Sequence, residues 1–221
     1  RPEELEWIQA RSAAFDAGYL LRVEEHIETN GFEQALYEVV REWQQARQAK
    51  AFTSEQRERM KNPKNEFHLE KAGANQWRLY PVTFKRNLEH TFREVQTGEP
   101  IATTLTFDNP YDSQPVQFYV TARSADGNTT ATVNRLTIEF NNYHSIEINE
   151  PLKAGDKLYC DGKCIYLCDG QWNKLRPVYS DKIPAWNTGD NNLVIKSTFS
   201  GNQAPTLIFE LKSLGKAEDV N

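Results

Sequence analysis

The sequence predicts an α+β protein in which an N-terminal helical segment precedes an antiparallel β-sandwich of jelly-roll-like type. Two observations predict this class. Apolar residues recur at helical spacing up to about residue 62, and from about residue 66 apolar and polar residues alternate with a period of two. Turn signals separate many short apolar runs in the second part, as is typical of sandwiches and barrels. We therefore expect a helical segment over residues 1–62 and a β-sandwich over residues 63–221.

The composition is that of a globular protein with an ordinary core. The chain has 221 residues, of which 38% are hydrophobic and 26% are charged. This length suits one large or two small domains, and a core of this size needs no disulfides. The net charge of −5 provides no basic field for nucleic acid. No apolar run reaches the roughly 18 residues that a membrane span needs. We therefore expect neither a nucleic acid partner nor a membrane span.

Residues 3–61 are expected to be helical, since Pro2 is acceptable in a first helical turn and Glu3, Glu4 and Glu6 suit the positive end of the helix dipole. Gly18 is expected to kink or divide the first helix, and Asn30-Gly31 ends this region. Its apolar residues at roughly helical spacing are Leu5, Ile8, Phe15, Leu20, Val23 and Ile27.

A second long helix follows, with a clear apolar stripe that runs from Phe32 to Ala46 at helical spacing. A short third helix is expected to begin at Thr53, because Thr53 and Gln56 have the spacing of a capping box. Asn62-Pro63 ends it, since a residue before proline disfavours helical geometry.

The remaining chain reads as a series of short strands. Asp161-Gly162 and Asp169-Gly170 indicate hairpin turns, and Asp126-Gly127-Asn128 and Asn141-Asn142 are further turn signals. The polar tail Gly215–Asn221 is expected to fray. Strand-like pairs of apolar residues lie around Phe67 and Trp77, and the longer predicted runs are Ile101–Phe107, Val116–Ala122, Thr130–Phe140, Ser145–Ile148, Lys157–Cys160, Cys164–Cys168, Leu193–Phe199 and Thr206–Leu211.

The two long helices carry more apolar surface than they can cover for each other, since Trp7, Phe15, Tyr19, Leu20 and Leu21 spread around the first helix. Such a surface marks a contact face, so we expect the helices to pack on the β half or on a partner outside this chain.

Seven segments of the chain carry a resemblance to known proteins, namely Glu4–Tyr19, Glu42–Arg47, Ala51-Phe52, Trp77–Pro81, Ile138–Asn142, Leu152–Asp156 and Gly189–Leu193. Together they resemble the C-terminal region of TIM-barrel glycoside hydrolases from polysaccharide-degrading bacteria, that is, the last barrel helices and the β-sandwich that follows them. The resemblance implies that the chain is the end of such an enzyme, or a relative of that part, with the catalytic carboxylates on barrel strands upstream. It also implies a periplasmic or extracellular location, a role in polysaccharide utilisation and a catalytic barrel domain as partner.

Acidic residues on the helices offer no recognisable catalytic pair. Glycosidases need two carboxylates across a sugar bond, and barrel enzymes place them at strand ends. The helical acids are therefore interpreted as lining solvated faces or capping turns. Asp16 lies between two apolar residues and is expected to bind a neighbouring backbone group or an arginine. The acids considered are Asp16, Glu24, Glu25, Glu28 and Glu42.

The cysteines and histidines do not have the spacing of a metal site. Cys160, Cys164 and Cys168 form C-x3-C-x3-C, whereas zinc sites favour C-x2-C pairs with further ligands. A Cys160–Cys164 disulfide stays open as an alternative to three partly buried strand residues. His26, His68, His90 and His144 are scattered. No phosphate-binding or nucleophile motif occurs, and no metal or cofactor is predicted.

Sugar binding needs flat aromatic faces beside amides and carboxylates, and the late β half supplies them. Trp186 follows Pro184 in a loop-like stretch and is expected to be exposed, whereas Trp172 alternates with polar neighbours and could belong to the core. The candidate glycan-binding residues are Trp186, Asn187, Asp190, Trp172, Asn173 and Tyr143.

The sequence thus predicts a non-catalytic accessory or carbohydrate-binding region of a carbohydrate-active enzyme, which positions glycan or buttresses a catalytic barrel. A glycoside hydrolase with unrecognised carboxylates and a purely structural sandwich without ligand remain as alternatives.

Overall fold

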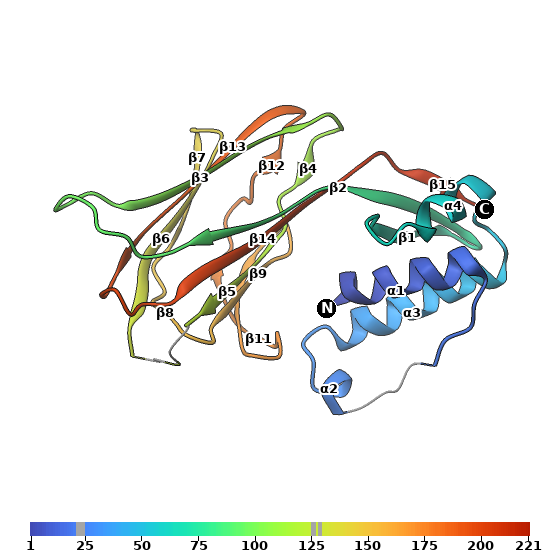
Figure 1. Cartoon of the computed structure of the whole chain (residues 1–221), viewed down its shortest axis with the longest axis horizontal. Coiled ribbons are helices and arrows are strands. Elements are labelled where there is room, and N and C mark those ends of the chain that lie inside the picture. Colours follow the sequence, from blue (N-terminus) through green and yellow to red (C-terminus); the bar gives the residue numbers. More distant parts are fainter. Residues whose placement is uncertain (21–24, 125–126, 128–129) are drawn as a thin grey trace. The chain divides into compact units, whose positions relative to one another are not determined.

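A computed structural model describes residues 1–20, 25–124, 127 and 130–221, and the chain forms two compact units (Figure 1). Unit 1 comprises Arg1–Phe84 and Leu214–Asn221, and unit 2 comprises Lys85–Ser213. The predicted class is confirmed, since N-terminal helices are followed by antiparallel sheets in a sandwich. The units have different bounds from the predicted 1–62 and 63–221, because residues 63–84 and 214–221 group with the helices. Leu21, Val23, Glu24, Asp126 and Asn128, which the sequence analysis names, lie outside the described residues.

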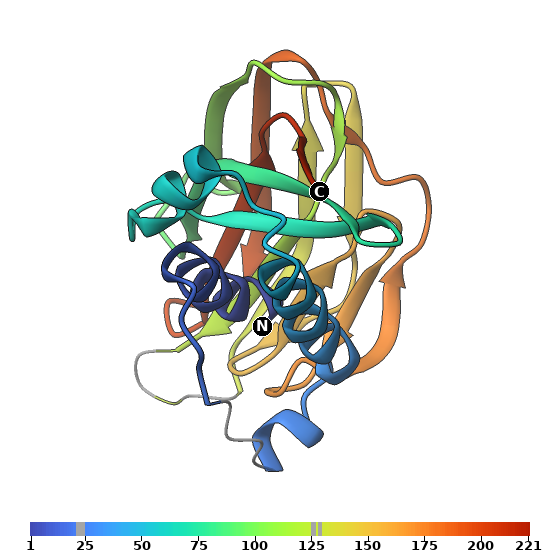
Figure 2. The same cartoon turned by 90° about the vertical axis from the view of Figure 1, so that its right-hand side faces the viewer.

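Unit 1 combines helices with a small antiparallel sheet in the order β1-β2-β15. Figure 2 shows β1 and the first half of β2 lying across α1 and α3. The elements are α1 (Pro2–Phe15), α2 (Glu25–Glu28), α3 (Glu33–Gln48), α4 (Ser54–Lys61), β1 (Phe67–Gly73), β2 (Gln76–His90, which continues into unit 2) and β15 (Glu218–Val220).

Small residues on α1 allow the close packing of this unit. Ala10, Ala13 and Ala14 are buried on one side of α1 and leave room for Trp43 of α3, which stacks on Phe52 with 5.6 Å between ring centroids. The sheet covers the helices with Trp77 and other apolar side chains of β1, β2 and β15. The helices therefore find part of their missing cover within their own unit.

The first helix ends earlier than its apolar pattern suggests. It stops at Phe15, because Asp16 adopts a left-handed conformation with φ 49° and its backbone N–H returns to the Ala13 carbonyl. Gly18 therefore lies beyond the helix. Apolar side chains at and after the end of the helix stay exposed, since Phe15 is 62% and Leu20 is 96% exposed.

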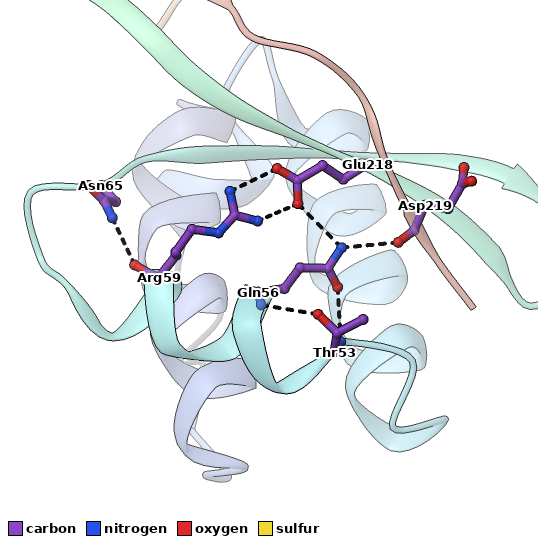
Figure 3. Close-up of polar contacts among 6 residues, drawn as sticks. All are labelled: Thr53, Gln56, Arg59, Asn65, Glu218 and Asp219. Atoms are coloured by element: carbon purple, nitrogen blue, oxygen red, sulfur yellow. Dashed lines mark hydrogen bonds and ion pairs between the residues drawn. The ribbon is translucent and has the colours of Figure 1, made fainter.

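The short helix α4 begins as predicted. Thr53 Oγ1 accepts a hydrogen bond from the Gln56 backbone N–H at 3.1 Å, and Gln56 Oε1 accepts one from the Thr53 backbone N–H at 2.9 Å. This reciprocal pair is a capping box (Figure 3).

The prediction that the C-terminal tail frays is wrong. β15 pairs with β2, and Val220 opposite Trp77 is completely buried. Figure 3 shows that α4 also holds this strand: the Gln56 amide donates to the Asp219 carbonyl at 3.0 Å, and the Arg59 guanidinium donates to the Glu218 carboxylate at 2.8 Å. The tail looks polar in sequence because Glu218 pairs with Arg59 and only Val220 of the three strand residues is buried.

Unit 2 is a sandwich of two antiparallel sheets (Figure 1). One sheet has the order β2-β14-β5-β9-β10-β11 within this unit, and the other has the order β3-β13-β6-β7, with β8 paired to β6. A two-stranded ribbon joins β4 to β12. The strands are β3 (Ile101–Asn109), β4 (Gln114–Pro115), β5 (Phe118–Arg123), β6 (Thr132–Phe140), β7 (His144–Ile148), β8 (Leu152–Lys153), β9 (Lys157–Cys160), β10 (Ile165–Cys168), β11 (Lys174–Tyr179), β12 (Ala185–Trp186), β13 (Gly189–Phe199) and β14 (Thr206–Leu214).

Alternation of buried and half-buried residues in β13 and β14 fits the predicted period of two. The edge strand β11 escapes that pattern, because most of its residues are exposed and Pro177 interrupts it. Proline and charged residues are typical of edge strands, where they discourage pairing with another chain. None of the described helices is long and apolar enough to cross a membrane.

Candidate functional site

An open hollow of about 710 Å³ lies at one end of the β3-β13-β6-β7 sheet, and we call it the hollow throughout. It is formed by the end of β3, the start of β13, the turn between β6 and β7, and the segment that joins β12 to β13. Three of the six predicted glycan-binding residues meet there, namely Tyr143, Asn187 and Asp190. The full lining is Thr106, Phe107, Asp108, Asn141, Asn142, Tyr143, Asn187, Asp190, Asn191 and Asn192.

The turn between β6 and β7 presents an aromatic ring to solvent. Asn141 and Asn142 adopt left-handed conformations with φ of 53° and 63°, which asparagine tolerates better than most residues. The turn predicted from this Asn-Asn pair is confirmed, and it places Tyr143 where its side chain is 74% exposed. The sequence therefore builds a short hairpin whose tip carries an uncovered ring.

A hydrogen bond fixes this ring against the opposite wall. The Asn187 side-chain amide donates to the Tyr143 hydroxyl at 2.5 Å, so the two predicted residues touch although they are 44 positions apart. The amide contacts the hydroxyl of the phenol, and 74% of the residue stays exposed. Tyr143 is thus held in place without being buried.

Asn191 organises the hollow from below, and sequence reasoning missed it. This buried side chain uses its amide to donate to the Asn187 and Gly189 carbonyls at 2.9 and 2.8 Å. Its oxygen accepts from the Asn187 backbone N–H at 2.9 Å and from the Asn141 amide at 3.2 Å. All four hydrogen bonds that an asparagine side chain can make are therefore formed. The only signal for this role was the polar run at 189–192, which also reads as a simple turn.

Asn192 joins the same network but leaves one acceptor open. Its backbone N–H donates to Asn141 Oδ1 at 2.7 Å, and its amide donates to Asn142 Oδ1 at 3.2 Å. Its own Oδ1 is buried and has no hydrogen-bond partner among the described residues. A buried acceptor without a donor is uncommon in folded proteins and calls for an explanation.

Two carboxylates face each other on the floor of the hollow. Asp108 of β3 is the direct cross-strand partner of Asp190 of β13, and both side chains are exposed. Within the described part of the chain, neither carboxylate has a hydrogen bond or an ion pair. Like charges directly opposite each other destabilise a sheet, so this pair costs stability where it lies. Asp108 was not among the predicted residues, because only the register of β3 with β13 brings it to Asp190.

Trp186 does not face the hollow, and the prediction that it is exposed is wrong. Its side chain is 1% exposed and packs on Phe107 and Phe140, with centroid distances of 5.0 and 5.5 Å. The pairing of β12 with β4 turns the indole into the sandwich, and the proline-containing stretch before it gives no hint of this pairing. A sugar cannot stack on this ring in the folded structure.

Trp172 and Asn173 lie elsewhere in unit 2, in the turn between β10 and β11. Trp172 is 8% exposed; its ring contacts Tyr119 edge-on at 5.1 Å, and Lys157 Nζ lies 4.5 Å from the ring centroid. Asn173 donates two hydrogen bonds to the Asp169 carboxylate, which closes the turn. The structure therefore does not bring these two predicted residues to the hollow.

Asp16 and Glu42, two of the helical acids, are engaged in structural contacts. Asp16 forms an ion pair with Arg47 at 3.0 Å, which confirms the expected arginine contact. The expectation that Glu42 lines a solvated face is wrong, since its residue is 7% exposed and it accepts from the Trp77 indole at 2.9 Å. Burial opposes ionisation of Glu42, but hydrogen bonds from Trp77, Arg41 and Lys71 outweigh it and lower the pKa.

The three cysteines are buried free thiols, as the favoured interpretation expected. Burial raises the pKa of Cys160 to about 12 and that of Cys168 to about 11, so both stay protonated at neutral pH. Among the described residues, no group of three or more potential side-chain ligands (His, Cys, Asp or Glu) could hold a metal ion.

His90, one of the four scattered histidines, is a packing residue of unit 2. His90 is fully buried between Thr103 and Ser197, whose hydroxyls lie 2.8 and 2.7 Å from its two ring nitrogens. Burial, aided by the nearby Arg93, lowers the pKa of His90 to about 4. It is a neutral, fully bonded core residue at neutral pH.

No protein-family model, curated protein or solved structure gives a significant match to this chain.

Proposed function

We propose that the chain is a non-catalytic carbohydrate-binding region of a carbohydrate-active enzyme, and that the hollow holds the glycan. The observation that carries this proposal is the uncovered Tyr143 ring, held by Asn187 beside a floor of amides and carboxylates. Trp186, Trp172 and Asn173 do not belong to the proposed site.

The chemistry of a sugar suits this arrangement. A pyranose ring offers an apolar C–H face, which packs on an aromatic ring, and a rim of hydroxyls, which need donors and acceptors. The Tyr143 ring supplies the first, and Asp190, Asn142 and Asn192 supply polar groups beside it. The Asn191 network fixes the segments that carry them, so little side-chain entropy is lost on binding.

The test is a glycan array followed by calorimetry on the oligosaccharides that bind. We expect affinity in the micromolar to millimolar range and a loss of about tenfold or more for Tyr143→Ala, because stacking then disappears. Asn187→Ala releases the ring and should weaken binding by a smaller factor. A blank array at high protein concentration would contradict the proposal and favour a structural module without ligand.

Matched controls separate binding from folding. Tyr37→Ala removes another partly exposed tyrosine, in α3 of unit 1, and should leave glycan binding unchanged. Tyr143→Phe keeps the ring and removes only the hydroxyl that Asn187 contacts, so it should retain most of the affinity. Urea unfolding should show that Tyr143→Ala is as stable as the unchanged protein.

A second candidate function, glycoside hydrolysis in the same hollow, is favoured by the facing carboxylates of Asp108 and Asp190. Directly opposed residues in a sheet have Cβ atoms about 5 Å apart, so the two carboxylates lie on one face of the sheet, and retaining glycosidases likewise use two nearby carboxylates. This candidate predicts turnover of aryl glycosides that disappears in both Asp108→Asn and Asp190→Asn. Binding without any turnover on a broad substrate panel would leave the non-catalytic proposal standing.

The proposal also includes a catalytic barrel as partner and a periplasmic or extracellular location. Exposed apolar side chains on α1, such as Trp7 and Ile8, favour a partner surface in unit 1. Sedimentation analysis tests the surface: the unchanged chain should associate, and Ile8→Lys should reduce the association. A monodisperse monomer at high concentration would count against the buttressing role.

A further inference from the structure

The polar groups of the hollow are strongly unbalanced toward hydrogen-bond acceptors. Asp108 and Asp190 bring two negative charges, and the Asn192 Oδ1 is a buried acceptor without a donor. The donors nearby are largely committed, because the amides of Asn141, Asn187 and Asn191 are used inside the network. Among the residues that the structure describes, no lysine, arginine or histidine lines the hollow.

The arrangement therefore lacks a positively charged donor. The two opposed aspartates repel each other, and neither has an ion-pair partner among the described residues. A cation on the ligand, placed between the two carboxylates, would relieve this repulsion. The exposed Tyr143 ring adds to this preference, since the face of an aromatic ring attracts cations.

We propose that the hollow selects a glycan that carries protonated amines, such as a glucosamine oligosaccharide, over the same glycan in its neutral form. This inference rests on the proposed function and names its ligand class. The ammonium group lies between the two carboxylates, and the sugar ring packs on Tyr143. An acidic glycan is disfavoured, because its carboxylates meet those of the protein.

The experiment compares two ligands that differ only in the amine. Calorimetry at mildly acidic pH measures binding of β-1,4-linked glucosamine oligosaccharide and of the N-acetylglucosamine oligosaccharide of the same length. We expect the amine form to bind about tenfold more tightly or better, with an advantage that shrinks as salt is added.

Variants of the two aspartates test where the preference arises. Asp190→Asn and Asp108→Asn should each weaken binding of the amine form by a larger factor than binding of the acetylated form, and should thereby remove most of the advantage of the amine form. Asp181→Asn removes an exposed acid of unit 2 that does not line the hollow, and it should leave the preference intact. Far-UV circular dichroism confirms that the three variants are folded.

Each outcome has a distinct meaning. Equal binding of the two ligands, with loss in Tyr143→Ala, would keep the proposed function and overturn the amine preference. Failure of both to bind would overturn the proposed function and this inference together. Calcium chloride alone is a third ligand in the titration. If calcium binds in an Asp190-dependent manner and the oligosaccharide preference disappears with a chelator, the hollow holds a metal ion and the amine assignment is wrong.

Discussion

The carboxylate in the buried polar centre of unit 1 and the carboxylates in the hollow of unit 2 differ in burial and in the number of hydrogen-bond donors around them. In unit 1, Glu6 is 2% exposed and accepts from the Leu69 backbone N–H at 2.9 Å, His68 at 3.0 Å and the Trp43 indole at 3.3 Å. In the hollow, Asp108 and Asp190 are exposed, face each other and have no donor among the described residues.

This difference separates structural acids from acids that are available to a ligand. Burial of a carboxylate is tolerated only when hydrogen-bond donors surround it. The Glu6 carboxylate is accordingly held by protein donors and is not available to a ligand. The aspartates instead remain in solvent with their acceptors open, which costs the sheet some stability. The donors around Glu6 therefore mark it as a structural acid, whereas the opposed aspartates of the hollow keep their acceptors open to a ligand.

The largest expected effect comes from breaking the unit 1 centre. Glu6→Ala should lower the free energy of unfolding by about 3 kcal/mol, because the indole of Trp43 and the N–H of Leu69 lose their buried acceptor. Urea unfolding followed by tryptophan fluorescence measures it. Glu4→Ala on the same helix is the control, since that side chain is 69% exposed and pairs with the N-terminal ammonium at 3.0 Å, and its cost should stay below about 1 kcal/mol. Equal costs for the two variants would contradict the distinction.

A change of comparable size in the free energy of unfolding should appear when the pH is lowered, because of His90 in unit 2. The unfolded chain protonates His90 near its ordinary pKa of 6.5, whereas the folded protein protonates it only near 4. Between these values the unfolded state binds more protons, so acidification removes up to about 3 kcal/mol of stability. The measurement is urea unfolding across this range for the unchanged protein and for His90→Asn. The difference in free energy of unfolding between the two proteins should change with pH between 6.5 and about 4. If this difference stays constant with pH, His90 is not buried as a neutral residue.

A smaller loss of stability is expected at the N-terminus of α4, where the capping side chain of Thr53 is exposed. Thr53→Ala removes the capping hydrogen bond of α4 and should cost about 1 kcal/mol, because the Gln56 N–H then has only water as partner. Thr53→Ser keeps the hydroxyl and should cost much less. Thermal unfolding of the three proteins gives the comparison, and an unchanged midpoint for the alanine variant would show that the cap contributes nothing.

The smallest effect has the opposite sign. Asp190→Asn should stabilise the folded protein by about 0.5 kcal/mol in low salt, since it removes the repulsion with Asp108, and added salt should erase the gain. Asp181→Asn provides the control for a general change in net charge. A loss of stability in Asp190→Asn would mean that this carboxylate has a structural partner, and it would weaken its assignment to a ligand.

Local signals in the sequence predicted the local structure well. The capping box at Thr53, the Asn141-Asn142 turn and the period of two in the long strands all depend on neighbours within a few residues. These signals also placed Tyr143, Asn187 and Asp190 among the candidates, because turns collect polar and aromatic residues that the core excludes.

The remaining features depend on pairings between distant parts of the chain. Trp186 is buried because β12 meets β4, and Asp108 joins the hollow because β3 lies beside β13. Val220 is buried because β15 completes the sheet of unit 1. Strand register over such separations is set by the whole core, and no local pattern contains it.

The position of β15 also has a consequence for the order in which the protein can be assembled during translation. Trp77 and Leu79 lie opposite Val220 and Glu218, yet about 130 residues of unit 2 are synthesised between them. Unit 2 is continuous in sequence and can collapse as soon as it leaves the ribosome, whereas unit 1 keeps an open sheet edge until the last strand emerges. We therefore expect nascent chains that stop before residue 214 to be recognised by chaperones through unit 1, although their sandwich is already formed.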